Sequence, residues 1–555
     1  MAEADILPLQ RLLHWERQRG GDIYLTQPIG GGNCQEFTWA QAVDEARRIA
    51  AYIKSHDWEP GSRVAIMSKN CAWWLIADWA IWMAGHVSVP IYPSLTRESV
   101  RQILKHSEAR LCFVGKLDNH EEMTAGIPLG VLHISMPLSK PSDWANWNDI
   151  VARVSPLTKM PARKAQELAT VIYTSGTTGT PKGVMHSFGS LGNVGRIMSE
   201  TFEAGTGDRV ISYLPLAHVA ERSLVEMMSL HGGSRIFFTE SLETFVGDLK
   251  RARPTLFGSV PRLWTKFQQG VFSRKPKAQL DRLFRIPLLG RIAKRRILRE
   301  LGLDSVRLAV TGAAPLTSET IAWYRQLGLE MLDLYGMTEN LALSHASRPG
   351  RMCIGYVGEP WPGVEVRKTA SGEILMRGPG NMLGYYKDPE KTQEAFSEDG
   401  FLRTGDIGEI DAEGRLKITG RAKEQFKTSK GKYVAPSPIE NRLGAHAAIE
   451  ACCVTGAAYP QPFAILMLSS LEYQRCQADA ARAELDRSLH EHLRLVNQQL
   501  DGHEQLDFVV VVPEQWTVEN GLITPTLKIK RAAVEKHYES SFNIWAKQRK
   551  AVVWA

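Results

Sequence analysis

Apolar residues recur with two different periods along this chain, and the two periods alternate. Short apolar and β-branched runs of strand length lie at 63–67, 87–92, 111–114, 131–134, 168–173, 210–214, 235–238, 255–257, 306–310 and 331–334. Between most of these runs the apolar residues recur every three or four positions, which is the period of an amphipathic helix. Strands that alternate with helices favour mainly parallel sheets flanked by helices, with binding sites at the strand ends. The pattern therefore predicts an α/β fold.

Capping residues mark where some of these helices begin. Thr38 is followed three residues later by Gln41, the arrangement of a capping box, and helix-spaced apolar residues follow. Thr96 precedes another such segment and is expected to cap it. The most apolar stretch, 72–83, contains four tryptophans and a single charged residue, Asp78. It is shorter than the roughly 20 residues that cross a bilayer, so we expect a core helix there and no membrane-spanning segment.

The pattern of residue types changes near Gly363. From there to residue 421, glycines punctuate short strand-like pieces, which is typical of a small, turn-rich β-subdomain. The last region again mixes strand-like runs, at 453–455, 463–467 and 508–512, with helical segments. These changes predict a large, multi-lobed N-terminal domain at 1–421 that includes a β-rich subdomain at about 363–421. A small α+β C-terminal domain is predicted at 422–555.

Composition adds an expectation about the compartment. The chain has 555 residues, of which 44% are hydrophobic and 23% charged, as in globular proteins with several lobes. Its seven cysteines include no Cys-x-x-Cys pair and no metal-type spacing, which predicts reduced structural thiols. Residues 1–13 carry Glu3, Asp5 and Arg11, so no secretory signal is expected there. These features predict a cytoplasmic protein.

Most of the positive charge lies in one segment. The net charge is +7, and residues 264–303 alone carry eleven Lys or Arg against two acids, so the rest of the chain is slightly acidic. Pro287 and Gly290 are expected to interrupt any longer helix there. Five apolar residues of this segment lie close to one helical face, namely Leu289, Ile292, Ile297, Leu298 and Leu301.

Three interpretations of this basic segment stay open. They are peripheral contact with an anionic membrane, contact with the phosphates of a substrate, and a solvated helix packed on the body of the protein. Nucleic acid is not expected as a partner, because no recognition motif accompanies the charge.

A Gly/Thr-rich stretch follows the apolar run at 168–173, with the sequence Thr174-Ser-Gly-Thr-Thr-Gly-Thr-Pro-Lys-Gly183. Glycines let backbone N–H groups curl around an anion, the hydroxyls add donors, and Lys182 adds a positive charge. The stretch is not a Walker loop, because Pro181 stands where that motif has its second glycine. On this stretch alone, an ordinary turn is the alternative to a phosphate cradle.

Seven further motifs follow in order. They are Tyr213-Leu-Pro-Leu-Ala-His-Val-Ala-Glu-Arg222, Thr311-Gly-Ala-Ala-Pro-Leu316, Tyr335-Gly-Met-Thr-Glu339, Arg403-Thr-Gly-Asp406, Gly420-Arg-Ala-Lys423, Lys427-Thr-Ser-Lys-Gly-Lys-Tyr-Val-Ala-Pro436 and Thr524-Pro-Thr-Leu-Lys-Ile-Lys-Arg531. The eight motifs, in this order and at this spacing, resemble those of the AMP-forming, adenylate-making synthetases. The Leu-Pro-Leu-Ala-His element and the last two motifs are most similar to those of long-chain fatty acyl-CoA synthetases.

The resemblance implies two half-reactions. A carboxylate and ATP form acyl-AMP and pyrophosphate, and the thiol of CoA then displaces AMP. The first step brings two anions together, so it requires oriented donors, a cation and Mg²⁺ rather than a covalent nucleophile. The implied partners are a long-chain fatty acid, ATP, CoA and Mg²⁺, and the oligomeric state is not indicated.

The resemblance also assigns roles to residues that match the motifs. The nucleotide-binding set would comprise Thr174, Ser175, Gly176, Thr177, Thr178, Gly179, Lys182, Gly312, Ala313, Ala314, Tyr335, Gly336, Asp406 and Arg421. Residues 174–182 would hold the β- and γ-phosphates, and Tyr335 would stack on adenine. Asp406 would accept both ribose hydroxyls, and Arg421 would reach the ribose or a phosphate. Thr338 would touch the α-phosphate and Glu339 would hold the magnesium ion.

The C-terminal domain is implied to be a mobile lid. Lys528 would reach from it to bridge the substrate carboxylate and the α-phosphate. Lys423 would be the hinge, although many relatives carry an aspartate there. Ser429, Lys430 and Gly431 would bind CoA, and Gly431 would let the pantetheine pass close to the backbone. A solvated basic tail is the plainer alternative for Lys528.

His218 would gate the pocket, since it follows a strand in the Leu-Pro-Leu-Ala-His element; a structural histidine is the alternative. The small residues at 312–314 would leave room for an acyl chain. Val219, Leu224 and Met227 are candidate linings of that tunnel, and core packing explains the same stripe.

The leading functional interpretation is a long-chain fatty acid:CoA ligase. Three alternatives stay open: an acyl-AMP ligase that loads a carrier protein, a catalytically silent lipid-binding paralogue, and a light-emitting oxygenase on the same scaffold. The presence of Lys528, Glu339 and the Gly/Thr loop argues against the silent paralogue. The acyl pocket is set by scattered contacts, so the sequence does not indicate the preferred chain length.

Overall fold

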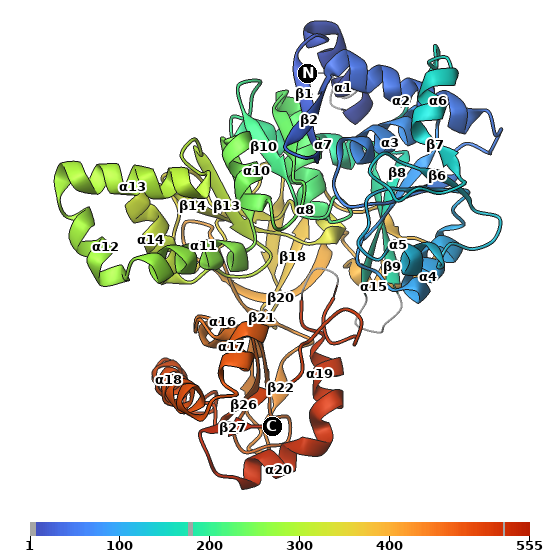
Figure 1. Cartoon of the computed structure of the whole chain (residues 1–555). Coiled ribbons are helices and arrows are strands. Elements are labelled where there is room, and N and C mark those ends of the chain that lie inside the picture. The colour runs from blue at the N-terminus through green and yellow to red at the C-terminus, as the bar shows by residue number, and fades with distance from the viewer. Residues whose placement is uncertain (1–6, 176–180, 525–527) are drawn as a thin grey trace. The chain divides into compact units, whose positions relative to one another are not determined.

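The alternating strands and helices form several sheets in two compact units of the chain (Figure 1). The computed structural model describes residues 7–175, 181–524 and 528–555. The first unit comprises Met1–Leu316, Thr320–Val366 and Met376–Leu402, and the second comprises Thr317–Glu319, Arg367–Leu375 and Arg403–Ala555. The predicted boundary at residue 421 lies beyond this division at Leu402, and it stays a prediction.

The largest sheet of the first unit has eight strands. Their spatial order is β19 (Gly384–Tyr385), β9 (Pro181–Ser187), β8 (Leu168–Ser175), β4 (Val87–Ile91), β3 (Arg63–Met67), β5 (Leu111–Val114), β6 (Leu132–Ser135) and β7 (Ala145–Asn146). From β8 to β7 neighbouring strands are parallel, and β9 and β19 add an antiparallel edge. The prediction of mainly parallel sheets is therefore confirmed for this sheet.

Two further sheets complete the first unit. One has the order β10 (Arg209–Ser212), β11 (Arg235–Phe238), β1 (Ile23–Gly30) and β2 (Asn33–Thr38), and is parallel except for the β1–β2 pair. The other has the order β12 (Leu256–Ser259), β13 (Leu308–Gly312), β14 (Met331–Tyr335), β15 (His345–Ala346) and β16 (Glu359–Pro360). Strands predicted in this part of the chain end within two residues of the observed ones, whereas β1, β2, β9 and the two-residue strands β7, β15, β16 and β19 are not among the predicted runs.

The helices lie between the strands as the period of the apolar residues predicts. Up to residue 395 they are α1 (Pro8–Arg19), α2 (Trp39–Lys54), α3 (Ala72–Met83), α4 (Arg97–Ser107), α5 (His120–Thr124), α6 (Trp147–Arg153), α7 (Phe188–Thr201), α8 (Val219–Glu221), α9 (Met228–Gly232), α10 (Phe245–Ala252), α11 (Pro261–Arg274), α12 (Lys277–Phe284), α13 (Pro287–Leu301), α14 (Ser318–Leu327) and α15 (Pro389–Ala395). A π-helix, η2 (Arg222–Met227), separates α8 from α9. Thr38 and Gln41 form the predicted capping box of α2, and Thr96 caps α4.

The tryptophan-rich stretch is a core helix. Every residue of α3 is buried, and the helix packs against α2 and against strands β1, β3 and β4. The prediction for 72–83 is confirmed residue by residue. No helix in the described part of the chain is long and apolar enough to cross a bilayer.

The basic segment forms α11, α12 and α13, and here one expectation is wrong. Gly290 does not interrupt a helix: α13 runs unbroken from Pro287 to Leu301, with Pro287 in its first turn, where a missing N–H costs nothing. The predicted apolar face is also split. Ile297, Leu298 and Leu301 pack against the core beneath the helix, whereas Leu289 and Ile292 point outward and are exposed.

The second unit is smaller and mixes strands with helices. Its main sheet has the order β24 (Ile449–Thr455), β25 (Phe463–Leu468), β26 (Val509–Val512) and β27 (Val552–Trp554), and β22 (Phe426–Lys427) pairs with β23 (Tyr433–Val434). Its helices are α16 (Pro436–Leu443), α17 (Ser470–Arg475), α18 (Asp479–Asn497), α19 (Arg531–Tyr538) and α20 (Phe542–Lys547). The α/β class, with a large N-terminal part and a small C-terminal part, is confirmed.

A glycine-punctuated sheet occupies the predicted β-rich region. Its order is β17 (Glu365–Lys368), β18 (Glu373–Arg377), β20 (Leu402–Ile410) and β21 (Leu416–Arg421). The division of the chain falls among these residues, at Val366, Leu375 and Leu402.

Candidate active site

The Gly/Thr stretch connects two antiparallel strands. In the pairing of β8 with β9, Thr174 lies opposite Lys182 and Ser175 opposite Pro181. The predicted phosphate-binding residues Gly176, Thr177, Thr178 and Gly179 lie outside the described residues. A strand rather than a helix follows the stretch, so any phosphate held here would meet hydroxyls, backbone N–H groups and Lys182 instead of a helix N-terminus.

Tyr385, which sequence analysis missed, brings two predicted site residues together. β19 pairs with β9, so that Tyr385 lies opposite Val184. The ammonium group of Lys182 lies 5.3 Å from the centre of the Tyr385 ring, and the Tyr385 hydroxyl donates a hydrogen bond of 2.9 Å to Oε1 of Glu339. Burial, together with the charge of Glu339, raises the pKa of Tyr385, so the hydroxyl keeps its proton and orients the carboxylate.

Glu339 sits in a short 3₁₀ turn, η3 (Thr338–Asn340), that follows β14. The backbone N–H of Met382 donates to its carbonyl at 2.8 Å. Gly336 precedes the turn where the chain passes close to Ala342, and a Cβ at Gly336 would lie 2.4 Å from the carbonyl carbon of Ala342. Only glycine fits this approach, which explains the glycine of the Tyr-Gly-Met-Thr-Glu motif.

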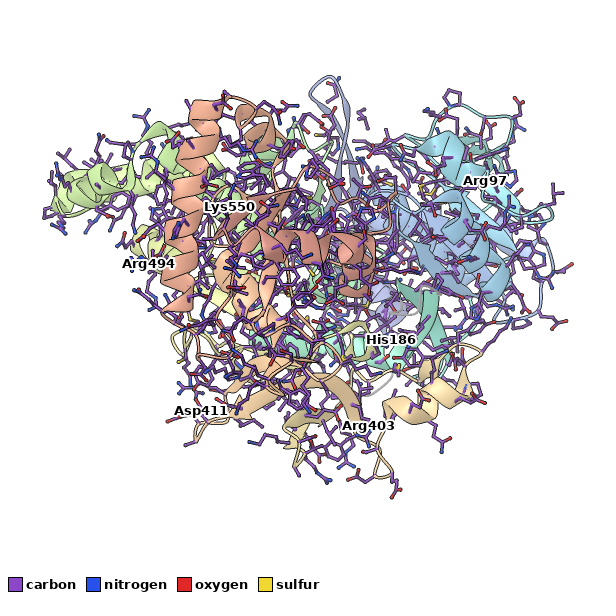
Figure 2. The ribbon with its side chains drawn as sticks, turned by 90° about the horizontal axis from the view of Figure 1, so that it is seen from below. Arg97, His186, Arg403, Asp411, Arg494 and Lys550 are labelled. Atoms are coloured by element: carbon purple, nitrogen blue, oxygen red, sulfur yellow. The ribbon has the colours of Figure 1, made fainter. Side chains whose placement is uncertain are left out.

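Two further residues that no motif indicated, His186 and Ser223, contact backbone carbonyls at this turn. His186, on β9 (Figure 2), contacts the Thr338 carbonyl through Nε2 at 2.8 Å. The hydroxyl of Ser223, on η2, donates to the Leu341 carbonyl at 2.9 Å. Burial, helped by the charge of Arg222, lowers the pKa of His186 to about 4. The imidazole is therefore neutral near pH 7, and because a carbonyl only accepts, we assign its proton to Nε2.

A buried charged cluster underlies these contacts. Arg222 is fully buried, forms an ion pair with Asp78 on α3, and has Nε 3.2 Å from Oε2 of Glu226. Its guanidinium lies over the rings of Trp74 and Trp82, 5.3 and 5.6 Å from their centres. Burial raises the pKa of both carboxyls, and that of Glu226 rises well above its ordinary value because Asp78 is also close. Glu226 therefore keeps its proton, and Arg222 and Asp78 form the charged pair.

Glu221 is the acid of the Tyr213–Arg222 motif. It precedes Arg222 in the sequence and is buried. Its Oε1 accepts hydrogen bonds from the Ser212 hydroxyl at 2.8 Å, the Tyr213 backbone N–H at 2.9 Å and the Asn70 amide at 3.2 Å. Burial still raises its pKa to about 8. The group thus ties the loop that carries His218 to strand β10.

His218 caps the short helix α8, and its Nδ1 accepts from the Ala220 backbone N–H at 3.1 Å. Its ring lies edge-on to Tyr92, with 6.4 Å between the ring centres. The side chain is half-buried, and a gating role stays a prediction.

The residues predicted to make room for the acyl chain differ in burial. Gly312 ends β13, while Ala313 and Ala314 are exposed, and Ala313 adopts a left-handed φ of 69°. Val219 and Met227 are only 2% and 1% exposed and belong to the main core of the first unit. Tyr335, predicted to stack on adenine, is half-buried at the end of β14, with its ring 6.0 Å from that of His345.

Asp406 and Arg421 lie opposite each other on β20 and β21 of the second unit. Arg421 Nε donates to Oδ1 of Asp406 at 2.9 Å. The aspartate side chain is 6% exposed and the arginine side chain 51%, so the arginine orients a carboxylate that is otherwise enclosed. Two carboxylate oxygens can accept from the two hydroxyls of a ribose.

The remaining predicted residues lie in loops of the second unit. Gly431, in the turn between β22 and β23, has a φ of 78°, which favours glycine. The Ser429 backbone N–H donates to the Tyr459 carbonyl at 2.9 Å. Lys528 is exposed; its carbonyl accepts from the Thr524 backbone N–H at 2.7 Å, and its own backbone N–H donates to the Thr524 hydroxyl at 3.0 Å. Lys423 lies between β21 and β22.

The donor set fits magnesium bound through a nucleotide. Mg²⁺ is commonly held by one or two carboxylates together with substrate phosphates. Glu339 supplies one carboxylate, oriented by the Tyr385 hydroxyl, and Lys182 supplies a cation 5.3 Å from the centre of the Tyr385 ring. Among the described residues, no group of three or more His, Cys, Asp or Glu is arranged to hold a metal without such help.

Comparison with known proteins agrees with this arrangement. Residues 13–386 match the family model described as AMP-binding enzyme, and residues 423–545 match that of the AMP-binding enzyme C-terminal domain. The long-chain-fatty-acid–CoA ligase FadD15 of Mycobacterium bovis is 30% identical over 94% of this chain and 94% of that protein. The peroxisomal long chain acyl-CoA synthetase 7 of Arabidopsis thaliana is 31% identical over 93% of this chain and 83% of that protein.

Solved structures show the same fold at lower identity. The A domain of carboxylic acid reductase from Segniliparus rugosus has a TM-score of 0.80 at 21% identity, covering 98% of this chain and 94% of that one. The anthranilate CoA ligase AuaEII has a TM-score of 0.77 at 20% identity, covering 98% and 99%. AMP-forming ligases of this family use ATP, Mg²⁺ and CoA. The chain therefore belongs to the family of AMP-binding, adenylate-forming enzymes.

Proposed function

We propose that this protein is an AMP-forming long-chain fatty acid:CoA ligase. The observation that carries the proposal is the contact of Tyr385 with both Lys182 and Glu339. Through one side chain it connects a cation and an oriented carboxylate that belong to two of the family's motifs. That combination suits a triphosphate whose charge must be neutralised before a second anion can approach it.

Each set of residues then has a task in the first half-reaction. The 174–182 stretch binds the β- and γ-phosphates, the Thr338 side chain orients the α-phosphate, and Tyr385 keeps Glu339 in position. Mg²⁺, when bound at Glu339, neutralises phosphate oxygens. In the second unit, Asp406 accepts the ribose hydroxyls and Lys528 binds the substrate carboxylate and the α-phosphate. The acid attacks the α-phosphorus, and pyrophosphate leaves.

The second half-reaction transfers the acyl group to CoA. The CoA thiol attacks the acyl carbonyl, and AMP leaves as the thioester forms. We assign the CoA contact to Ser429, Lys430 and Gly431, and the hinge between the proposed domains 1–421 and 422–555 to Lys423. The long-chain preference rests on three relatives that are 29–31% identical to this chain and are named as long-chain enzymes.

Product analysis by mass spectrometry tests the proposal directly. The enzyme is incubated with ATP, Mg²⁺ and a ladder of fatty acids, with and without CoA. Acyl-CoA and AMP, with a maximum at long chains, are the expected products. Acyl-AMP that accumulates in the presence of CoA would instead indicate an enzyme that loads a carrier protein. No adenylate with any acid would refute ligase activity on fatty acids.

Separate assays of the two half-reactions test the role of Lys528. The Lys528→Ala variant should lose acyl-AMP formation by about 100-fold or more, the effect of removing one charge-stabilising donor. Thioester formation from preformed acyl-AMP should stay largely intact. Lys530→Ala, two residues away, is the matched control and should retain both steps. An equal loss of both steps in Lys528→Ala would contradict the assignment.

A further inference from the structure

The outward face of α13 is an exposed surface of aliphatic and cationic side chains. Four large aliphatic residues within seven positions are exposed: Ile286 by 47%, Leu288 by 70%, Leu289 by 54% and Ile292 by 57%. Single exposed aliphatic residues are normal on a soluble protein, but a contiguous group marks an interaction site. In both views α12 and α13 project from the rest of the first unit (Figures 1 and 2).

The arginines of α13 share this face. Arg291, Arg295 and Arg299 follow Leu288 and Ile292 at spacings of three and four residues, which places them on one side of a helix. All three are exposed, and none forms an ion pair with a carboxylate among the described residues. Glu300, the single acid of α13, is already paired with Arg296 at 2.9 Å and with Arg274 at 3.8 Å.

The opposite face of α13 packs against the protein and holds the helix in place. Ile297, Leu298 and Leu301 pack against a core that includes Trp264 and Trp323, and Gly290 is buried against the end of α12. A Cβ at Gly290 would lie 2.7 Å from the Phe284 carbonyl oxygen, so glycine permits this close contact. The helix is thus fixed by its inner face, and its outer apolar residues contribute nothing to the core.

The chemistry of the outer face selects its partner. Aliphatic side chains can enter the acyl boundary of a bilayer while neighbouring guanidinium groups meet lipid phosphates. A protein interface of similar size would be expected to carry aromatic anchors. The aromatic residues of this segment that the structure describes, such as Phe272 and Phe284, pack inward. The exposed aliphatic residues, the unpaired charge and the lack of aromatic anchors among the described residues of this face therefore favour a lipid surface.

We propose that α13 docks this protein on anionic membranes. The docking face consists of Leu288, Leu289 and Ile292 together with Arg291, Arg295 and Arg299. The helix would lie in the plane of the interface with its aliphatic residues below the phosphates. The proposal stands on this surface alone and does not depend on which acid the enzyme activates.

Vesicle flotation of the full-length protein tests the proposal. One vesicle type is phosphatidylcholine alone, and the other contains about one quarter phosphatidylglycerol. We expect binding to the second type only, with weaker binding at about 1 M salt, where the screening length falls to about 3 Å. Equal binding to both types, or binding that salt does not change, would overturn the electrostatic part of the proposal.

Two sets of substitutions locate the contact. Replacing Arg291, Arg295 and Arg299 by Ser should weaken binding by about 100-fold, from about 1 kcal/mol per arginine near an anionic surface. Leu288→Ser combined with Ile292→Ser should weaken it by at least tenfold. The matched control removes three exposed arginines from α18: Arg482, Arg487 and Arg494, the last labelled in Figure 2. An equal loss in the control would show non-specific attraction and overturn the proposal.

Sedimentation without vesicles tests the remaining explanation, which is that this face is a contact between copies of the chain. If the α13 variants convert an oligomer to a monomer while vesicle binding is unchanged, the face is a contact between copies of the chain, and the proposal is wrong. Unchanged sedimentation together with lost vesicle binding supports docking. Because all substituted side chains are exposed, unfolding midpoints should stay at the wild-type value, which confirms that the variants are folded.

Discussion

Two regions of the first unit use the arginine side chain in opposite ways. Arg222 is fully buried between two carboxyls and two tryptophan rings, while Arg291, Arg295 and Arg299 are exposed on α13. A buried charge must be paired, because the cost of removing it from water is several kcal/mol. An exposed arginine is hydrated and needs no partner. The buried cluster therefore specifies packing, and the exposed face is available to a partner.

The buried arginine belongs to the π-helix η2. η2 contains Arg222, Ser223 and Glu226, and π-helical turns occur frequently at functional sites. Arg222 and Glu226 point into the core, whereas Ser223 contacts the Leu341 carbonyl next to the predicted magnesium ligand. One segment thus connects the charged core to the turn that carries Glu339.

The largest effect is expected when the buried pair is broken. Arg222→Met leaves Asp78 charged and unpaired, so stability should fall by about 3 to 5 kcal/mol. Thermal unfolding followed by tryptophan fluorescence is suitable, since Trp74 and Trp82 lie against Arg222. Adding Asp78→Asn should restore part of the loss. Arg295→Met is the exposed counterpart and should change stability by less than about 0.5 kcal/mol; equal losses in both regions would contradict the comparison.

The next largest effect concerns the pH dependence of stability. Burial raises the pKa of Glu221 to about 8 in the folded protein, against about 4.3 for an unperturbed glutamate. Below both values the group is protonated in both states and costs nothing. As the pH rises from about 4.3 to 8, only the unfolded chain releases the proton, so stability should fall by up to a few kcal/mol.

Glu221→Gln provides the measurement. Glutamine keeps an acceptor for Ser212, Tyr213 and Asn70 but does not titrate. Unfolding midpoints of the two proteins should therefore diverge between pH 5 and pH 8 in favour of the variant. Parallel curves over this range would show that Glu221 is ionised in the folded state.

A smaller effect is expected at His186, which links the cluster to the active-site turn. His186→Phe removes the donor to the Thr338 carbonyl, and kcat for adenylation should fall by about tenfold. The KM for the fatty acid should change little, because the proposed contacts of this turn are with phosphate and magnesium and not with the acid. His186→Gln, which keeps a donor, should recover part of the rate. A loss of stability without any change in kcat would make the residue purely structural.

The smallest effect is expected beneath the exposed face. Gly290→Ala introduces a methyl group 2.7 Å from the Phe284 carbonyl oxygen, although alanine favours a helix. The net loss should be about 1 kcal/mol, measured by thermal unfolding. Leu288→Ala, on the outer face of the same helix, is the control and should leave the midpoint unchanged. A stabilised Gly290→Ala would show that α12 and α13 can separate without cost.

Local sequence patterns determined much of this protein. The lengths of apolar runs located strands such as β3 and the core helix α3, because a fully buried element must be apolar on all sides. The capping box at Thr38 and Gln41 depends on contacts within one turn, so it can be recognised without a fold. The ordered motifs indicated the adenylate-forming family, since their chemistry needs particular residue types.

Only the tertiary structure decided the contacts between distant segments. Tyr385 meets Glu339 across 46 positions and Arg222 meets Asp78 across 144, and no local period reports such pairings. The sequence also did not show that some apolar residues of α13 are buried and others exposed. Helical periodicity shows that apolar residues share a side of the helix, but what covers each end of that side depends on neighbouring elements. Burial, and with it the pKa of groups such as Glu221 and His186, follows from packing and is therefore a property of the fold.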